Sequence, residues 1–254
     1  MTDPIDATKA ALVGEAQILA ETQGEAAERA LLPRFIADLY EHAPPSDIAL
    51  RSPADLCGAA LALWRFATLR PRGSAKLRVY NPAGIRDGWS SPHTIVEIIN
   101  DDMPFLVDSV TAAIDASGRE TRLVIHPILN VSRDAAGSLV ALDPPAGGLR
   151  ESWMQIAVTR EPDPTEREAL AARLAAVLAD VRAAVADWHE MRRTLQTIAD
   201  EAAAHPPPLP PDEIAESVAF LRWLDSDNFT YLGFRDYVFP GAGDALRAPT
   251  TPPL

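Results

Sequence analysis

Residues 93–110, HTIVEIINDDMPFLVDSV, decide the fold of this chain. The stretch begins as a strand, because β-branched residues crowd between Ile95 and Ile99. After an acidic, proline-containing turn at 101–104, apolar side chains recur at the spacing of a helix that lies on a sheet. Such a turn leaves the first helical amides free to hold a small polar ligand. The stretch therefore predicts a strand, a candidate ligand site and a helix in succession.

Two further strands and a long helix follow this unit. The strands are expected at 122–131 (RLVIHPILNV) and 153–159 (WMQIAVT), and the helix at 164–204. Asp163 is expected to cap that helix, with Pro164 at its first position. The order β-α-β-β-α is most of a ferredoxin-like split unit, the topology of ACT-type regulatory modules. The predicted fold class is therefore α+β, a ferredoxin-like ACT-type sheet domain preceded by a helical N-terminal segment and followed by a long helix.

The sheet still needs a fourth strand. Residues 76–80 are the candidate, because the long helix leads to no immediate strand. Pro127 interrupts the strand predicted at 122–131. Since proline has no N–H to donate to a ladder, we expect that strand to lie at an edge or to be bulged.

Long, ungapped motifs carry a family resemblance. VEIINDDMPFLVDSV, VIHPILNVSRD and ESWMQI, together with LRVYNP, GWSSPHT and LRWLDSDNFTYLGFRDY, resemble the N-terminal region of the large bacterial NAD-specific glutamate dehydrogenases. The resemblance runs from about residue 77 to residue 237. Members of that family are far longer than this chain. Their N-terminal part carries ACT-type domains, and their dehydrogenase domain lies well downstream.

The resemblance implies a regulatory and assembly segment that is not itself catalytic. The parent enzyme would deaminate L-glutamate oxidatively to 2-oxoglutarate and ammonium, with NAD bound in the downstream catalytic domain and no cofactor in this segment. The implied partners are the downstream domains of the same polypeptide, further copies in a homo-oligomer, and an amino-acid or carboxylate effector that acts allosterically. The alternative is an ACT-like scaffold that binds nothing and only orders subunits.

Composition narrows the class of protein. The 254 residues carry a net charge of −13, which argues against a nucleic-acid partner, because phosphates select clustered Lys and Arg. The sequence shows no apolar core of the kind found in signal peptides. It also has no run of the ~20 apolar residues that a helix needs to span a bilayer. Cys57, the single cysteine, lies in an apolar helical stretch and is expected to be a buried, inert thiol. We therefore expect a soluble, cytoplasmic chain with no membrane partner.

Three regions are expected along the chain. Residues 1–72 form the helical N-terminal segment, 73–205 the ACT-like domain with its long helix, and 206–254 the start of a next module. A strand expected at 230–239 (TYLGFRDYVF) has no predicted partner downstream. This absence suggests truncation or pairing with an earlier sheet.

The long helix carries a heptad pattern. Counting from Leu170 in steps of four and three meets only apolar residues as far as Ile198. A helix over 164–204 is about 60 Å long, too long to bury against a small sheet alone. Its distal half therefore packs either on the N-terminal helices or in a dimer or inter-domain seam. The seam candidates are Leu174, Val177, Val181, Trp188, Met191 and Leu195.

The turn after the first strand has the most chemical content. In one interpretation Asp101 or Asp102 takes the amino group of an effector while the helix amides hold its carboxylate. In another, an Asp simply caps the helix beginning near Pro104. Acid–base catalysis by the paired carboxylates is disfavoured, because no nucleophile, base partner or metal cluster accompanies them. The tentative effector-binding residues are Asn100, Asp101, Asp102, Pro104, Phe105 and His126.

Phe105 and His126 differ from the other candidates in what they could contribute to a site. Many amino-acid-binding ACT domains have glycine directly after the proline, and this chain has Phe105, whose bulk fills that space. ACT-type sheets often associate side by side, which makes His126 a candidate for the second wall of a pocket. Farther along, Arg133 and Asp134 are expected in a solvated turn. The five histidines show no metal-ligand spacing, and no catalytic constellation is visible.

Overall fold

The computed structural model describes residues 4–23, 26–235 and 237. The chain divides into two compact units, one up to Leu178 and the other from Ala179. The division falls inside the longest helix, α8 (Pro164–Ala204, 41 residues). Within the described ranges, no helix is both long and apolar enough to cross a membrane.

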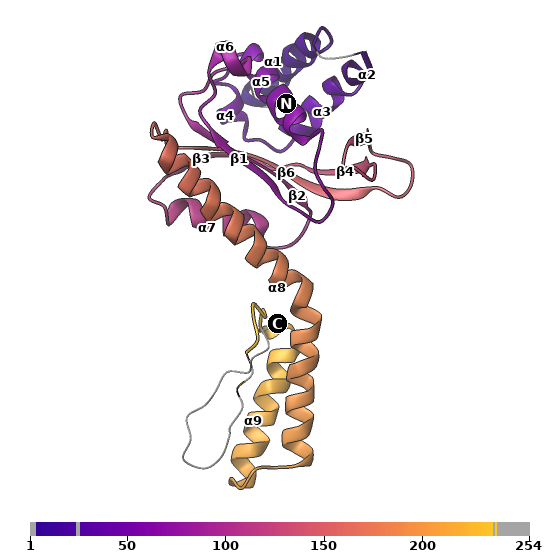
Figure 1. The fold of residues 1–254 in the computed structure, drawn as a ribbon, viewed down its shortest axis with the longest axis vertical. Coiled ribbons are helices and arrows are strands. Elements are labelled where there is room, and N and C mark those ends of the chain that lie inside the picture. The colour runs from indigo at the N-terminus through magenta and orange to yellow at the C-terminus, as the bar shows by residue number, and fades with distance from the viewer. Residues whose placement is uncertain (1–3, 24–25, 236, 238–254) are drawn as a thin grey trace. The chain divides into compact units, whose positions relative to one another are not determined.

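A six-stranded antiparallel sheet forms the centre of the first unit (Figure 1). Its strands run in the order β1-β2-β6-β4-β5, and β3 also pairs with β6. β6 therefore lies in the middle and joins every part of the sheet except the two outermost strands. The strands are β1 (Lys76–Tyr80), β2 (Thr94–Asp101), β3 (Thr121–Ile125), β4 (Ile128–Arg133), β5 (Leu139–Leu142) and β6 (Leu149–Val158).

The predicted ferredoxin-like α+β class is confirmed. The strand expected at 76–80 is β1, and it pairs antiparallel with β2 as the fourth strand of the motif. The strand expected at 122–131 is broken at Pro127 into β3 and β4, which both pair with β6. The carbonyl of Pro127 still accepts the Trp153 N–H at 3.1 Å, so proline interrupts this ladder by its missing donor alone. β5 is an additional strand that was not predicted.

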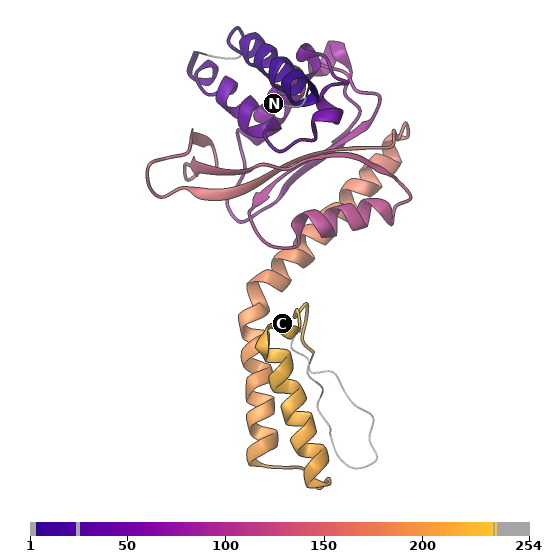
Figure 2. The ribbon, with the colours of Figure 1, turned by 180° about the vertical axis from the view of Figure 1, so that it is seen from behind.

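Helices cover both faces of this sheet (Figures 1 and 2). On one face lies the N-terminal layer, whose last long helix begins where Ser52 accepts the Asp55 N–H at 3.1 Å. On the other face lie α7 (Leu106–Asp115) and the first part of α8. The N-terminal layer consists of α1 (Pro4–Ala20), α2 (Ala26–Arg29), α3 (Leu32–Tyr40), α4 (Pro45–Ile48) and α5 (Pro53–Ala67), with α6 (Gly84–Asp87) following β1.

The two faces of the sheet bury different side chains. Toward the N-terminal layer, Trp153 packs against Phe35 with ring centroids 5.4 Å apart, and Phe35 packs against Trp64 at 5.2 Å. The residues that alternate with Trp153 along β6, such as Met154 and Ile156, point to the opposite face and are also buried. That second face is aliphatic, which fits the packing of α7 and α8 on a sheet.

In the second unit the distal part of α8 packs with α9 (Pro211–Trp223). The Arg192 Nε donates to the Asp225 carboxylate at 2.5 Å, just after α9, and Arg222 on α9 pairs with Asp200 at 3.5 Å. This half of the helix therefore has α9 as a partner, which was not named among the expected ones. The expectation of a strand at 230–239 is wrong for residues 230–235 and 237, which form no strand, and the remaining positions lie outside the described residues.

Candidate functional site

The alternation of β2 separates the two acidic residues of the turn. Asp101 is opposite Glu151 on β6, and both lie on the face covered by the N-terminal helices. Asn100 is opposite Ser152, and with Asp102 it belongs to the face covered by α7. Asp101 and Asp102 are adjacent in the sequence, but the alternation of side chains along the strand places their carboxylates on opposite faces of the sheet.

On the first of these faces Asp101 joins a group of buried charges. Its carboxylate lies 2.5 Å from the Arg70 guanidinium, which is fully buried and also pairs with Glu151 at 3.1 Å. The Arg133 Nε donates to Glu151 at 2.6 Å, and the Trp153 indole donates to the same carboxylate at 2.9 Å. We call Arg70, Asp101, Arg133, Glu151 and Trp153 the buried ionic cluster.

The expectation of a solvated turn at Arg133 is wrong. Arg133 is 5% exposed, and its guanidinium also donates to the Gly137 carbonyl at 2.9 Å. Gly137 has φ +89°, and a side chain there would collide with the Arg70 carbonyl, so glycine allows the β4–β5 turn to approach α5's end. Two arginines and two carboxylates balance each other in this cluster, which indicates a structural role.

A second buried carboxylate on the same face also escaped the sequence analysis. Glu97 on β2 is fully buried and accepts from Arg78 at 2.5 Å and from Gln155 at 2.9 Å. Burial raises the pKa of Glu97, and the Arg78 guanidinium opposes that rise. Its position among the β-branched residues of an otherwise apolar strand is the signal that could have identified it.

On the α7 face, polar side chains converge at the end of the sheet. The His126 Nε2 lies 2.6 Å from the Ser152 hydroxyl, and Ser152 is the register partner of Asn100. Burial lowers the pKa of His126, while the nearby Asp102 raises it in part. Asp102 also pairs with Arg150 at 3.0 Å. We call Asn100, Asp102, His126 and Ser152 the sheet-end cluster.

The backbone of the turn adopts the conformation of a glycine turn. Phe105 precedes α7 with φ +70° and ψ −2°, in the left-handed region, and its side chain gives no capping hydrogen bond. The interpretation of an Asp cap is therefore wrong. This is the position where many ACT domains carry glycine, and holding a side chain in that region costs roughly 1–2 kcal/mol. Pro104 and Phe105 are both exposed.

The start of α7 supplies unpaired donors. The first N–H groups of a helix have no acceptor within the helix, and they carry its partial positive charge. The Ser109 N–H is already used by the Phe105 carbonyl at 3.0 Å, which leaves Leu106, Val107 and Asp108 as the first-turn residues. The structure thus brings three predicted site residues, Asn100, Asp102 and His126, near one helix start and places Asp101 elsewhere.

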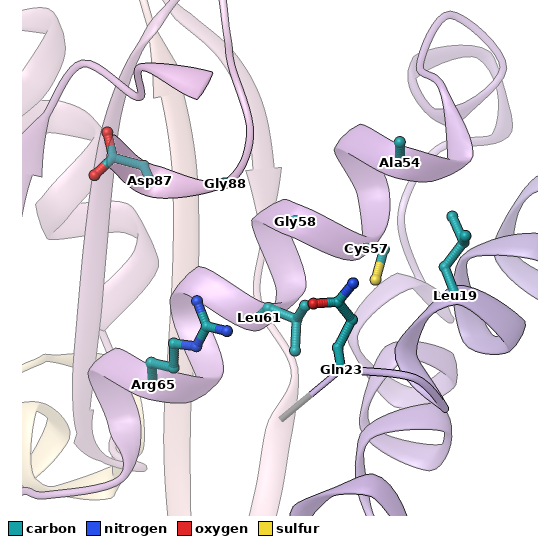
Figure 3. A pocket seen from close by; sticks show the side chains of 9 residues that line it. All are labelled: Leu19, Gln23, Ala54, Cys57, Gly58, Leu61, Arg65, Asp87 and Gly88. Carbon is teal, nitrogen blue, oxygen red and sulfur yellow. The ribbon is translucent and has the colours of Figure 1, made fainter. Parts of the chain in front are cut away.

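A separate cavity of about 200 Å³ lies beside Cys57 (Figure 3). Cys57 is 4% exposed and its thiol lies on the side of α5 that faces Leu19 and Gln23. Burial raises the pKa of the thiol, which keeps it protonated and unreactive at neutral pH. The prediction of a buried cysteine is confirmed. Gly58 lines the same cavity, and a side chain there would collide with Trp89.

The predicted seam of α8 is divided between the two units. Leu174 is fully buried in the first unit, whereas Met191 is buried in the second. Trp188 is 37% exposed and stacks on His189 with ring centroids 4.0 Å apart. An assembly role for the seam therefore stays a prediction. The other seam candidates are Val177 and Leu195, which are half-buried, and Val181, which is buried.

No group of three or more His, Cys, Asp or Glu side chains in the described part of the chain is arranged to hold a metal ion. The buried carboxylates instead have arginine partners, as at Glu97 and Glu151. The polar chemistry of the site is therefore that of hydrogen bonds and ion pairs.

Comparisons with known proteins find similar sequences. The sequence model of the family described as "Glutamate dehydrogenase, ACT1 domain" matches residues 35–174. The chain is 37% identical over 203 residues to an NAD-specific glutamate dehydrogenase of Halomonas elongata, covering 78% of the chain and 13% of that relative. It is 31% identical over 205 residues to the enzyme of the same name from Pseudomonas aeruginosa, covering 79% and 13%.

A third relative is more distant. The NAD-specific glutamate dehydrogenase of Mycobacterium tuberculosis is 28% identical over 196 residues, covering 72% of the chain and 12% of that relative. The chain thus spans only 12–13% of the length of the curated relatives it matches.

Proposed function

The chain belongs to the glutamate dehydrogenase ACT1 domain family, and we propose that it is the N-terminal regulatory and assembly segment of an NAD-dependent glutamate dehydrogenase. The match to that family carries the proposal. It extends from α3 through every strand of the sheet into the first part of α8, so it includes both the sheet-end cluster and the buried ionic cluster.

Catalysis in this proposal belongs to the rest of the polypeptide. The relatives are named for NAD-specific glutamate dehydrogenation, and the chain corresponds to 13% of the first two. The parent enzyme would convert L-glutamate and NAD to 2-oxoglutarate, ammonium and NADH in its downstream domains. This segment would contribute no catalytic residue and no cofactor ligand, and would act in homo-oligomer assembly and in sensing.

The sheet-end cluster is the proposed effector site. An amino-acid or carboxylate effector would place its carboxylate at the first amides of α7, where a helix favours negative charge. Asp102 would receive an amino group, and His126 with Asn100 would supply hydrogen-bonding groups from the neighbouring strands. Convergence of these side chains on one face supports this assignment.

A specific observation favours the alternative of a scaffold that binds nothing. Both carboxylates of the turn already have arginine partners, Arg70 for Asp101 and Arg150 for Asp102. Phe105 also occupies the position where other ACT domains have glycine. In the scaffold alternative, the turn only stabilises the fold, and the chain only arranges neighbouring subunits and domains.

Titration calorimetry separates the two. The chain is titrated with aspartate, glutamate, arginine and citrate, and the titration is repeated with Asp102→Ala. Asp115→Ala is the matched control, because Asp115 is an exposed carboxylate at the far end of α7. Saturable binding that Asp102→Ala weakens tenfold and Asp115→Ala preserves supports the effector site. If none of the four compounds gives a heat of binding, the result supports the scaffold alternative.

Regulation requires a second measurement, on the full-length parent enzyme. An effector that binds this segment must change the parent's affinity for glutamate by the same factor as glutamate changes the affinity for the effector. Equal factors in the two directions support the regulatory proposal. The regulatory proposal is contradicted if the bound effector leaves the parent enzyme's affinity for glutamate unchanged.

A further inference from the structure

A cavity of about 380 Å³ lies at the other end of β2 from the sheet-end cluster. Three separate segments build it: the loop between α4 and α5 with Arg51, the loop before β2 with His93, and the edge strand β3 with Arg122. We call this the Arg51 pocket. Since β2 has eight residues at about 3.3 Å each, roughly 23 Å separates the two ends.

Arg51 is a cation without a carboxylate partner. Within residues 4–23, 26–235 and 237, no carboxylate forms an ion pair with its guanidinium. The acidic side chains of the pocket wall, Asp47 and Asp55, contact hydroxyl groups and form no ion pair with Arg51 in the described part of the chain. Asp55 accepts the Ser52 hydroxyl at 2.7 Å at the start of α5, and Asp47 lies beside the Ser46 hydroxyl at 3.4 Å.

Arg122 adds a second cation whose existing partner is easily exchanged. It pairs with Glu120 on the same edge of the sheet, and the two side chains are 52% and 70% exposed. Exposed pairs of this kind contribute little to stability. Burial, followed by the charges of Arg51 and Arg122, lowers the pKa of His93, which lines the same cavity as both arginines.

The remaining walls combine hydroxyl groups with apolar surface. Ser90 and Ser91 lie on the loop before β2, and Trp89 is 4% exposed beside them. Leu123 follows Arg122 on β3 and is buried. The cavity has the volume of a small-molecule site, and it combines several polar side chains with apolar surface.

We propose that the Arg51 pocket binds a small dicarboxylate, with one carboxylate on Arg51, the other on Arg122, and the hydrocarbon chain against Trp89 and Leu123. The planar guanidinium matches a carboxylate with two parallel hydrogen bonds. The regulatory meaning of this binding rests on the proposed function, whereas the binding itself does not.

Glutarate is the probe, and the intact 254-residue chain is the sample. Calorimetry compares the unchanged chain with Arg51→Gln and with Arg122→Gln. The matched control is Arg173→Gln, an exposed arginine of α8 that is not among the pocket's lining residues. Each pocket variant is expected to weaken glutarate about tenfold or more, because a charge-assisted hydrogen bond is lost. The control is expected to leave the affinity unchanged.

Two further readouts keep the test decisive. Arg51 forms no ion pair with the residues that the structure describes, so Arg51→Gln is expected to keep the thermal transition of the unchanged chain and to report on binding alone. The His93 ring protons are expected to titrate at higher pH with glutarate bound, since an anion stabilises the imidazolium.

The proposal is overturned by any of three results. These are no saturable glutarate binding, equal affinity in Arg51→Gln and the unchanged chain, or inorganic phosphate binding as tightly as glutarate. Because every readout is made on the chain alone, a failed parent-enzyme experiment leaves this result standing, and the reverse also holds.

Discussion

The two ends of strand β2 carry charged residues for different purposes. At the end near α7, Asp101 pairs with Arg70 and Asp102 pairs with Arg150. At the other end, Arg51 lines a cavity and pairs with no carboxylate in the described part of the chain. A ligand at the first end must compete with the protein's own ion pairs. A ligand at the second end supplies Arg51 with an ion-pair partner that the described residues do not provide.

The largest effect is expected when an arginine near each end of β2 is replaced by methionine. Arg133→Met is expected to lower the free energy of unfolding by about 3–5 kcal/mol, because it leaves Glu151 buried with one guanidinium fewer. Arg51→Met is expected to change it by less than about 0.5 kcal/mol. Urea unfolding of the first unit measures both. Similar losses for the two variants would break the comparison.

The next effect compares the adjacent carboxylates of the turn. Asp101→Asn weakens a charge-assisted hydrogen bond to the fully buried Arg70 and is expected to cost about 1.5–3 kcal/mol. Asp102→Asn weakens a pair with Arg150, whose side chain is 69% exposed, and is expected to cost about 0–1 kcal/mol. Thermal unfolding ranks the two. Equal costs would mean that the opposite faces of the sheet do not determine the roles of these residues.

A smaller and stabilising effect is expected at the turn itself. Phe105→Gly removes a side chain from a left-handed backbone position, whereas Phe105→Ala removes the ring but keeps the strain. We expect Phe105→Gly to be more stable than Phe105→Ala by about 1 kcal/mol. If the alanine variant is equally stable, the turn does not need glycine-like geometry. New amino-acid binding by Phe105→Gly would also locate the effector site here.

The smallest expected effect is a pH dependence at His126. Burial holds its pKa below the ordinary value of 6.5, so the unfolded chain takes up the proton first as the pH falls. Its contribution to stability is therefore complete above that value and is lost as the pH decreases toward the folded pKa. The stability difference between the unchanged chain and His126→Gln should shrink or reverse on crossing pH 6.5 downward. A constant difference would exclude a buried, neutral imidazole.

The α7 end could be predicted from sequence because its elements are local. The change from strand to helix spacing across residues 93–110 and the strand at 76–80 follow from neighbouring residues, and the structure confirms both. The strand with Pro127 was expected to be bulged or at an edge; it is instead divided into β3 and β4, and β4 lies between β5 and β6. The Asp163 cap is equally local, since its carboxylate accepts the Thr165 N–H at 2.8 Å.

What the sequence could not reveal depends on contacts between distant residues. Arg70 follows α5, and only folding brings it to Glu151, which lies 81 residues farther along the chain. The Arg51 pocket likewise joins segments around residues 51, 93 and 122. Each of these arginines is ordinary in its local context. What distinguishes the roles of Arg70 and Arg51 is whether the fold places a carboxylate within ion-pair distance of the guanidinium.

One measurement tests this comparison most directly: backbone NMR shifts of the chain titrated with glutarate. We predict saturable shifts for Ser90, Ser91 and His93 at the start of β2, with Asn100 and Asp102 unmoved. Saturable shifts confined to Asn100 and Asp102, with Ser90 to His93 unmoved, would contradict the account.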